Sequence, residues 1–123
     1  MNPQAIIHAL EARSVKLLVS RGYEPVRPVS GSIFWWRVPL NFVGMKGDTQ
    51  ALCVKLRIAH GSVSEEYVET NYPYDICRFR SLLLQALGDI SPQCEIWVLS
   101  PNNALHCFEV LSTTIREVAA YTR

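Results

Sequence analysis

The stretch NFVGMKGDTQALCVKLRI, residues 41–58, has the clearest strand pattern in the chain. Its two arms, joined by a Lys-Gly-Asp turn, are residues 41–45 and 50–58. The second arm alternates between an aliphatic face and a face that carries Cys53, Lys55 and Arg57, which is the two-residue period of a β-strand. A glycine in the turn can adopt positive φ. The stretch therefore predicts a β-hairpin in which Cys53 and Lys55 point the same way.

Helices and further strands are expected on both sides of this hairpin. The predicted helices are residues 3–21, 73–87 and 112 to the C-terminus, and the further strands are residues 33–40, 95–99 and 105–111. Apolar residues recur at helical spacing in the first two helices, with Gly22 and Gly88 as C-caps and Ser112 as the N-cap of the third. The predicted order is α-β-β-β-α-β-β-α, which is the α/β class.

Length and composition favour one compact globular domain over residues 1–123. The chain is 49% hydrophobic and 19% charged, with a mean hydropathy of +0.09. It has no apolar run of the roughly 18 residues that a membrane span needs. Its N-terminus lacks the basic region followed by an apolar stretch that is typical of a signal peptide, so we expect a cytoplasmic protein. The four cysteines form no C-x-x-C pair, which disfavours a zinc or thioredoxin-like site and favours buried reduced thiols.

Charge is distributed unevenly along the chain. Residues 1–60 contain eight Lys or Arg and three acids, a net +5, whereas residues 61–123 contain four and eight, a net −4. This asymmetry suggests a basic face that could meet a polyanion such as nucleic acid. A similar imbalance is also common on proteins that bind nothing charged.

The order of residues within 9–58 resembles the archaeal Holliday junction resolvases of the PD-(D/E)xK nuclease superfamily. The shared features are Glu11 in the first helix, Leu17-Leu18 through Gly22-Tyr23 at its end, Arg27, Ser30-Gly31-Ser32, and the strands Leu40–Gly44 and Leu52–Lys55. The resemblance implies a restriction endonuclease-like fold, in which a central mixed sheet is flanked by helices. It also implies DNA as a partner and a symmetric homodimer.

The resemblance places a degenerate catalytic site on this chain. The family holds magnesium between an aspartate and a glutamate beside a lysine, and those positions are occupied here by Asn41, Cys53 and Lys55, with Glu11 as the helix glutamate. Magnesium prefers anionic oxygen ligands, whereas an amide is neutral and a thiol is soft. We therefore expect no metal site, no cofactor and no ordinary metal-dependent cleavage.

Several residues have a nucleic-acid interpretation and a structural alternative. The candidate contacts are Arg13, Arg27, Ser30, Ser32, Arg37, Lys46 and Arg57, together with Lys55. The cations could follow a phosphate backbone, or they could be ordinary surface charges. The two serines are better explained as turn residues. No neighbouring His or Asn motif supports a catalytic role for Cys53. The three histidines are not spaced as metal ligands or as an acid-base pair.

Adjacent Trp35 and Trp36 in one strand must point to opposite faces, which would leave one at the surface. An exposed tryptophan could stack on a base, but a dimer interface is the better interpretation because aromatic residues are enriched there.

Three functions follow from these features. The first is a nucleic-acid-binding protein of the nuclease fold that has lost metal-dependent cleavage. The second is an active structure-selective DNA endonuclease with displaced acids, for which Mg²⁺ would be the cofactor and the available acids are Glu11, Asp48, Glu65 and Glu66. The third is an interaction or scaffold protein with no nucleic-acid role.

Overall fold

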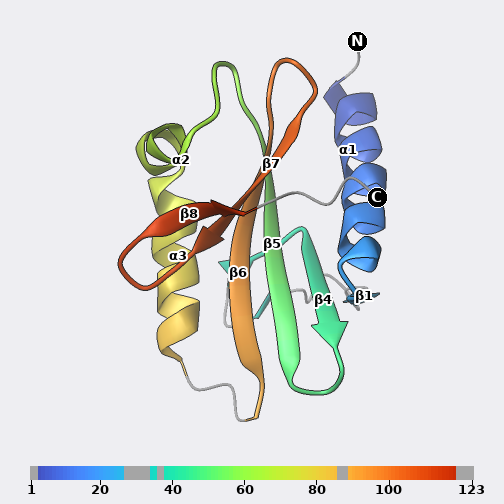
Figure 1. Ribbon diagram of the computed structural model, residues 1–123, viewed down its shortest axis with the longest axis vertical. Helices are drawn as coiled ribbons and strands as arrows, with labels where there is room; N and C mark the ends of the chain where they lie inside the picture. The colour runs from blue at the N-terminus through green and yellow to red at the C-terminus, as the bar shows by residue number, and fades with distance from the viewer. Residues whose placement is uncertain (1–2, 27–33, 36–37, 86–88, 119–123) are drawn as a thin grey trace.

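The computed structural model describes residues 3–26, 34–35, 38–85 and 89–118 (Figure 1). Its helices are α1 (Pro3–Ser20), α2 (Glu65–Asn71) and α3 (Pro73–Leu84). Its strands are β1 (Glu24–Val26), β2 (Phe34–Trp35), β3 (Val38–Pro39), β4 (Phe42–Lys46), β5 (Gln50–Ile58), β6 (Ser91–Leu99), β7 (Leu105–Val110) and β8 (Ile115–Val118). Six strands form one sheet in the order β1-β4-β5-β6-β7-β8, and β2 pairs with β3 separately.

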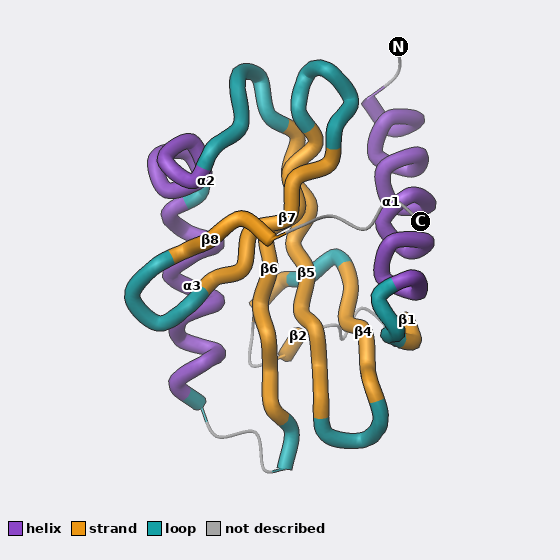
Figure 2. The backbone as a smooth tube through the Cα atoms, in the orientation of Figure 1, coloured by secondary structure: helices purple, strands orange, loops and turns teal. Residues whose placement is uncertain are grey.

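The main sheet is mixed and has helices on both faces. Strands β5 and β6 run parallel, and the other neighbours in the sheet are antiparallel. Helix α1 lies on one side of the sheet, and α2 and α3 lie on the other (Figure 2). Each side has its own buried cluster, one built on Leu10 and Leu18 of α1 and the other on Ile76 and Phe79 of α3. This architecture confirms the predicted α/β class.

The hairpin forms where the sequence predicts it. Val43 pairs with Cys53, and Lys46 pairs with Gln50. Gly47 in the turn has a φ of 66°, which is the left-handed conformation that glycine adopts at little cost. Helix α1 ends as predicted too, with Gly22 at a φ of 89° just beyond it.

The C-terminal helix that was predicted from Ser112 is wrong. Residues Ile115–Val118 form β8, which pairs with β7. A tight turn joins the two strands, in which the Leu111 N–H donates to the Thr114 carbonyl at 2.8 Å. The edge of β7 offers partners to the backbone of this segment, and its β-branched residues suit a strand. Residues 119–123 lie outside the described part of the chain.

The predicted order of elements needs three further corrections. Residues 33–40 do not form one strand, because β2 and β3 pair with each other antiparallel. Residues Glu24–Val26 form the edge strand β1 despite Pro25, which an edge strand tolerates. The acidic stretch before α3 contains the short helix α2, capped by Ser64, whose hydroxyl accepts the Tyr67 N–H at 3.1 Å.

The C-terminal ends of β5 and β6 lie at one end of the molecule. The β5–α2 connection and the β6–β7 turn are both found there, at the top of Figure 1, whereas the β4–β5 turn lies at the opposite end. In sheets with helices on both faces, ligands commonly bind at the carboxyl ends of parallel strands. No helix within the described residues combines the length and apolarity that a membrane span requires.

Candidate functional site

Asn41 lies at the point where β5 extends beyond β4. The last register pair of the two strands is Phe42 with Val54, and β5 continues to Ile58. The Asn41 N–H donates to the Val54 carbonyl at 2.9 Å, and its Oδ1 accepts the Leu56 N–H at 2.9 Å. The side chain therefore acts as one more backbone partner for β5, and its amide oxygen is committed to that contact.

Two hollows meet at Asn41. The first, called the β5 pocket here, has a volume of about 360 Å³. Its apolar lining is Leu10, Leu56 and Ile58, and its aromatic and polar lining includes Tyr67, Tyr72, Asn41, Asn71 and Arg57. The second hollow, of about 520 Å³, has Glu11 and Asn41 in its wall. The structure thus brings two of the four predicted catalytic positions to one surface.

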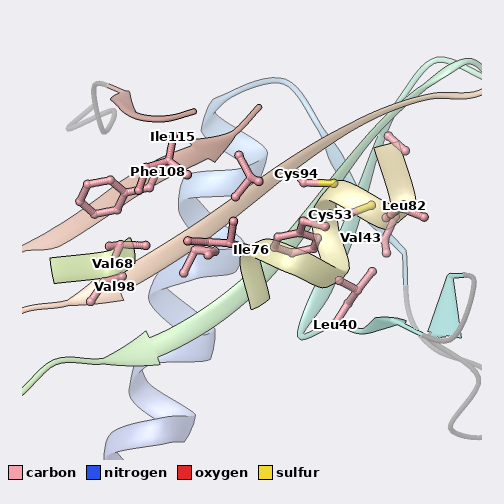
Figure 3. Packing of buried hydrophobic residues seen from close by; sticks show 14 of the residues in the cluster. Leu40, Val43, Cys53, Val68, Ile76, Leu82, Cys94, Val98, Phe108 and Ile115 are labelled. Atoms are coloured by element: carbon pink, nitrogen blue, oxygen red, sulfur yellow. The ribbon is translucent and has the colours of Figure 1, made fainter. Parts of the chain in front are cut away.

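Cys53 does not reach this surface. It has no exposed area and belongs to the core beneath α3. Its register partner across the parallel strands is Cys94, which belongs to the same buried cluster (Figure 3). The hydrogen bond to Cys53 and burial raise the pKa of Cys94, so this thiol stays protonated. A neutral thiol closed inside a core is no ligand for a hard cation.

Arg57 is held by a carboxylate from α3. Its Nε donates to Asp75 Oδ2 at 2.6 Å, and its Nη2 donates to Oδ1 at 2.8 Å. The hydrogen bond to Asp75 raises the pKa of Arg57. The guanidinium carbon also lies 5.7 Å from the ring centroid of Tyr72. Arg57 is thereby fixed at the wall of the β5 pocket with 40% of its side chain exposed.

Lys55 lies among like charges. Burial lowers its pKa, and the charges of Arg57 and Arg78 lower it further, while Asp75 acts in the opposite direction. Within the described residues, Lys55 has no ion-pair partner. Two cations, Arg57 and Arg78, and one carboxylate, Asp75, thus act on the Lys55 ammonium. We call Lys55, Arg57 and Arg78 the cationic cluster.

Arg13 and Lys46, the other predicted nucleic-acid contacts that the structure describes, lie elsewhere. Arg13 Nη1 donates to the Asn103 carbonyl of the β6–β7 turn at 2.8 Å. Lys46 lies over the Tyr23 ring at the opposite end of β5, where its pairing with Gln50 puts it seven residues from Arg57, or roughly 23 Å along a strand. Four predicted contacts lie outside the described residues, namely Arg27, Ser30, Ser32 and Arg37. The side chains of Trp35 and Trp36 also lie outside them.

The acids available for a displaced metal site are dispersed. Asp48 lies in the β4–β5 turn, far from the hollow that Glu11 borders. Glu65 accepts the Glu117 N–H at 2.9 Å, and Glu66 is exposed on α2. Among the residues the structure describes, no group of three or more His, Cys, Asp or Glu side chains is arranged to hold a metal ion. The described acids that were considered for a displaced metal site therefore do not come together.

Sequence reasoning missed Asp75 and Arg78. Asp75 follows Pro73 in the first turn of a helix, where a carboxylate is favoured by the helix dipole whatever its function. Arg78 is an exposed helical arginine of an ordinary kind. Neither residue carries a local signal, because their importance comes from their distance to β5 in space.

A second bidentate ion pair lies on the α1 side of the sheet. Arg21 Nη1 and Nη2 donate to the two oxygens of Glu95 at 2.7 and 2.8 Å. Gln93 Nε2 and Trp97 Nε1 also donate to this carboxylate, at 2.9 and 2.8 Å. Glu95 has no exposed area. The pair is enclosed in the core and forms no part of the candidate site.

Comparison with known proteins finds similarity to solved structures but not to family models or curated proteins. No family model matches the chain, and no curated protein matches it. The backbone is similar to that of Hjc, a Holliday junction resolvase from the archaeal hyperthermophile Archaeoglobus fulgidus. The two share 14% sequence identity with a TM-score of 0.48, over 92% of this chain and 88% of that one. A likeness of this degree carries no information on activity, so function has to be inferred from the residues of this chain.

Proposed function

We propose that this chain is a nucleic-acid-binding protein of the restriction endonuclease-like fold that does not perform magnesium-dependent cleavage. The observation that carries the proposal is the cationic cluster, in which Arg57 is held by Asp75 and the charges of Arg57 and Arg78 both act on Lys55. Burial lowers the pKa of Lys55 and the two arginines lower it further, so an anion bound next to this lysine would favour its charged form. Phosphate groups of a nucleic-acid backbone are anions of the right charge and spacing for clustered Lys and Arg side chains.

The absence of cleavage follows from the side chains at the family positions. The Asn41 oxygen is occupied by the Leu56 N–H, and the Cys53 thiol is enclosed against Cys94. Phosphodiester hydrolysis in this family depends on a metal to provide the nucleophile and to neutralise the transition state. Lys55 remains as a phosphate contact with no metal partner beside it. As the sequence resemblance implies, we expect the binding unit to be a homodimer.

The test is the salt dependence of DNA affinity, measured by fluorescence anisotropy with a labelled four-way junction and a labelled duplex. Each lost phosphate contact should reduce the slope of log K against log salt by about 0.9. We expect this reduction for Lys55→Gln. Lys16→Gln is the matched control, because Lys16 is exposed on α1 away from the cluster and the charge change is the same.

The outcomes separate the functions considered. Equal slopes for Lys55→Gln, Lys16→Gln and the unchanged protein would show that the cluster is not the binding surface. No binding to either DNA would leave an interaction protein without a nucleic-acid role. Cleaved junction after incubation with Mg²⁺ or Mn²⁺ would establish an active nuclease and overturn the second half of the proposal.

A further inference from the structure

We propose that the β5 pocket receives one unpaired base of a DNA strand whose neighbouring phosphate lies on the cationic cluster. This inference rests on the proposed function and deepens it, since it names an unpaired nucleotide as the preferred ligand. It is carried by the position of the pocket, its aromatic walls, its polar groups and its connection to the cluster.

The pocket exists because β5 is longer than its neighbour. Strand β4 stops pairing at Phe42, so the last residues of β5 have no strand on that side. Leu10 of α1 borders the resulting space on one side, and Tyr72, between α2 and α3, borders it on the other. Leu10, Leu56 and Ile58 provide an apolar surface. A volume of about 360 Å³ lies within the range of small-ligand sites.

Two tyrosine rings form a fixed aromatic wall. The rings of Tyr67 and Tyr72 are 5.9 Å apart at an angle of 72°, an edge-to-face pair, and their side chains are hydrogen-bonded. The His60 N–H also donates to the Tyr67 hydroxyl at 3.1 Å. Arg57 lies over the Tyr72 ring. Unpaired bases are bound by stacking on such rings and on arginine planes, and a wall already held in place loses little entropy on binding.

Two amide side chains give the pocket one donor group and one acceptor. The oxygen of Asn41 is held by the Leu56 N–H, so its NH₂ group is what remains for a ligand. The nitrogen of Asn71 donates to the Tyr67 carbonyl at 2.9 Å, which leaves its oxygen as an acceptor. The edge of every nucleobase presents donors and acceptors, and enzymes that take up flipped bases bind them through that edge.

The distribution of charge indicates that the base would occupy the pocket and the phosphate would lie on the cationic cluster. No carboxylate is among the described residues that line the pocket, and Arg57 is its one permanently charged residue. Arg57 also belongs to the cationic cluster with Lys55 and Arg78. A neutral base in the pocket therefore puts the adjacent phosphate beside Lys55. A duplex can reach the cluster, but its stacked bases cannot enter the pocket.

The experiment compares two single strands of equal charge. The probes are a labelled eight-nucleotide strand of thymidines and a strand of eight abasic residues with the same phosphates. Because stacking of one base on an aromatic side chain is worth about 1–3 kcal/mol, we expect the thymidine strand to bind about tenfold more tightly or better. Equal affinity for the two strands would overturn the pocket as a base site, whatever the salt dependence.

Pocket variants locate the effect. Asn71→Ala should reduce the thymidine preference while leaving the affinity for the abasic strand within about twofold, and Tyr72→Leu should also reduce the thymidine preference. The matched control is Tyr74→Ala, because this tyrosine is 79% exposed on α3 and does not line the pocket. A thymidine preference that persists in the pocket variants, or that is lost in Tyr74→Ala, contradicts the assignment.

A direct measurement covers the case in which a variant does not fold. In ¹⁵N-resolved NMR spectra of the unchanged protein, the Asn71 side-chain amide and the Leu56 backbone amide should shift with the thymidine strand and remain in place with the abasic strand. Identical shifts with both strands would contradict the inference. Failure of both strands and of duplex DNA to bind would remove the proposed function as well, which distinguishes the two failures.

Discussion

Two bidentate arginine–carboxylate pairs among the described residues have the same chemistry and different surroundings. Arg21 and Glu95 lie on the α1 side with 11% and 0% of their side chains exposed. Arg57 and Asp75 lie on the α3 side with 40% and 7% exposed. Both pairs connect a helix, or the turn after it, to a central strand. What differs is the set of polar groups around each carboxylate.

Around Glu95 the hydrogen-bonding is complete. Gln93 and Trp97 add their N–H groups to those of Arg21, so the carboxylate meets only neutral donors besides its own cation. Around Asp75 the balance is different, because Arg57 and Arg78 both act on the nearby Lys55, and Asp75 is the one acid among the described residues that opposes them there. The Arg21–Glu95 pair is therefore a structural element that is closed to ligands. The Arg57–Asp75 pair leaves positive charge available for an anionic ligand. An ion pair indicates a binding site only when its neighbours leave it unbalanced.

The largest effect should come from breaking the enclosed pair. Arg21→Ala leaves the Glu95 carboxylate buried without its cation, which typically costs about 3–5 kcal/mol of unfolding free energy. Urea denaturation followed by circular dichroism measures this. The control is Arg116→Ala, whose pair with Glu109 is mostly exposed on the arginine side, with an expected loss below about 1 kcal/mol. Similar losses of unfolding free energy for the two variants would show that the buried Arg21–Glu95 pair contributes no more than an exposed one.

Asp75→Asn should have a smaller effect on stability, which falls, and an opposite effect on DNA affinity, which rises. Arg57 remains partly solvated when its carboxylate is lost, so the unfolding free energy should fall by only about 1–2 kcal/mol. DNA affinity should rise, because the carboxylate that pairs with Arg57 has been neutralised. Denaturation and anisotropy measured on the same variant test both signs. Weaker DNA binding by a folded Asp75→Asn protein would contradict the surplus of positive charge.

The two regions also differ in how stability should respond to alkaline pH. Burial, and then the charge of Glu95, raises the pKa of Cys107 from 9.0 to about 12. The folded chain keeps this proton where the unfolded chain has lost it, so the contribution is complete below pH 9 and is lost as pH rises toward 12. The slope should reach at most about 1.4 kcal/mol per pH unit. Denaturation between pH 8 and 11 measures it, and Cys107→Ala should make the slope shallower.

Lys55 responds to pH with the opposite sign. Burial and its cationic neighbours lower its pKa from 10.5, so between the lowered and the ordinary pKa the unfolded chain binds the proton more tightly. Its contribution to unfolding free energy therefore rises with pH in that window. We therefore expect unfolding free energy to fall less steeply with alkaline pH in Cys107→Ala and more steeply in Lys55→Gln than in the unchanged protein. The same dependence of unfolding free energy on pH in the unchanged protein and both variants would contradict this difference between the two regions.

The smallest effect concerns the thiols. Cys77 is exposed on α3, whereas Cys53, Cys94 and Cys107 are buried, so a maleimide reagent should modify one site on the native protein and four after denaturation. Mass spectrometry counts the sites. Modification of Cys53 or Cys94 in native conditions would show that the core under α3 opens. The expectation of buried thiols is thus confirmed for three of the cysteines and wrong for Cys77.

Local pattern explains which elements were predicted correctly. The hairpin, α1 and α3 each have a periodicity and an end signal within their own residues, and each was found close to its predicted bounds. The short helix α2 had such a signal too, in Ser64 followed by two glutamates, and could have been predicted. The C-terminal strand β8 could not, because its conformation depends on the edge of β7.

The sequence by itself determined the hairpin and the glycine that ends α1, since each depends on residues that are adjacent or regularly spaced. Tertiary structure alone decided that Asp75 meets Arg57 from 18 residues away and that Glu95 meets Arg21 from 74. It also decided that Cys53 lies under α3, so that both faces of β5 are covered. Charge balance and burial depend on which residues become neighbours when the sheet assembles, and no local pattern specifies them.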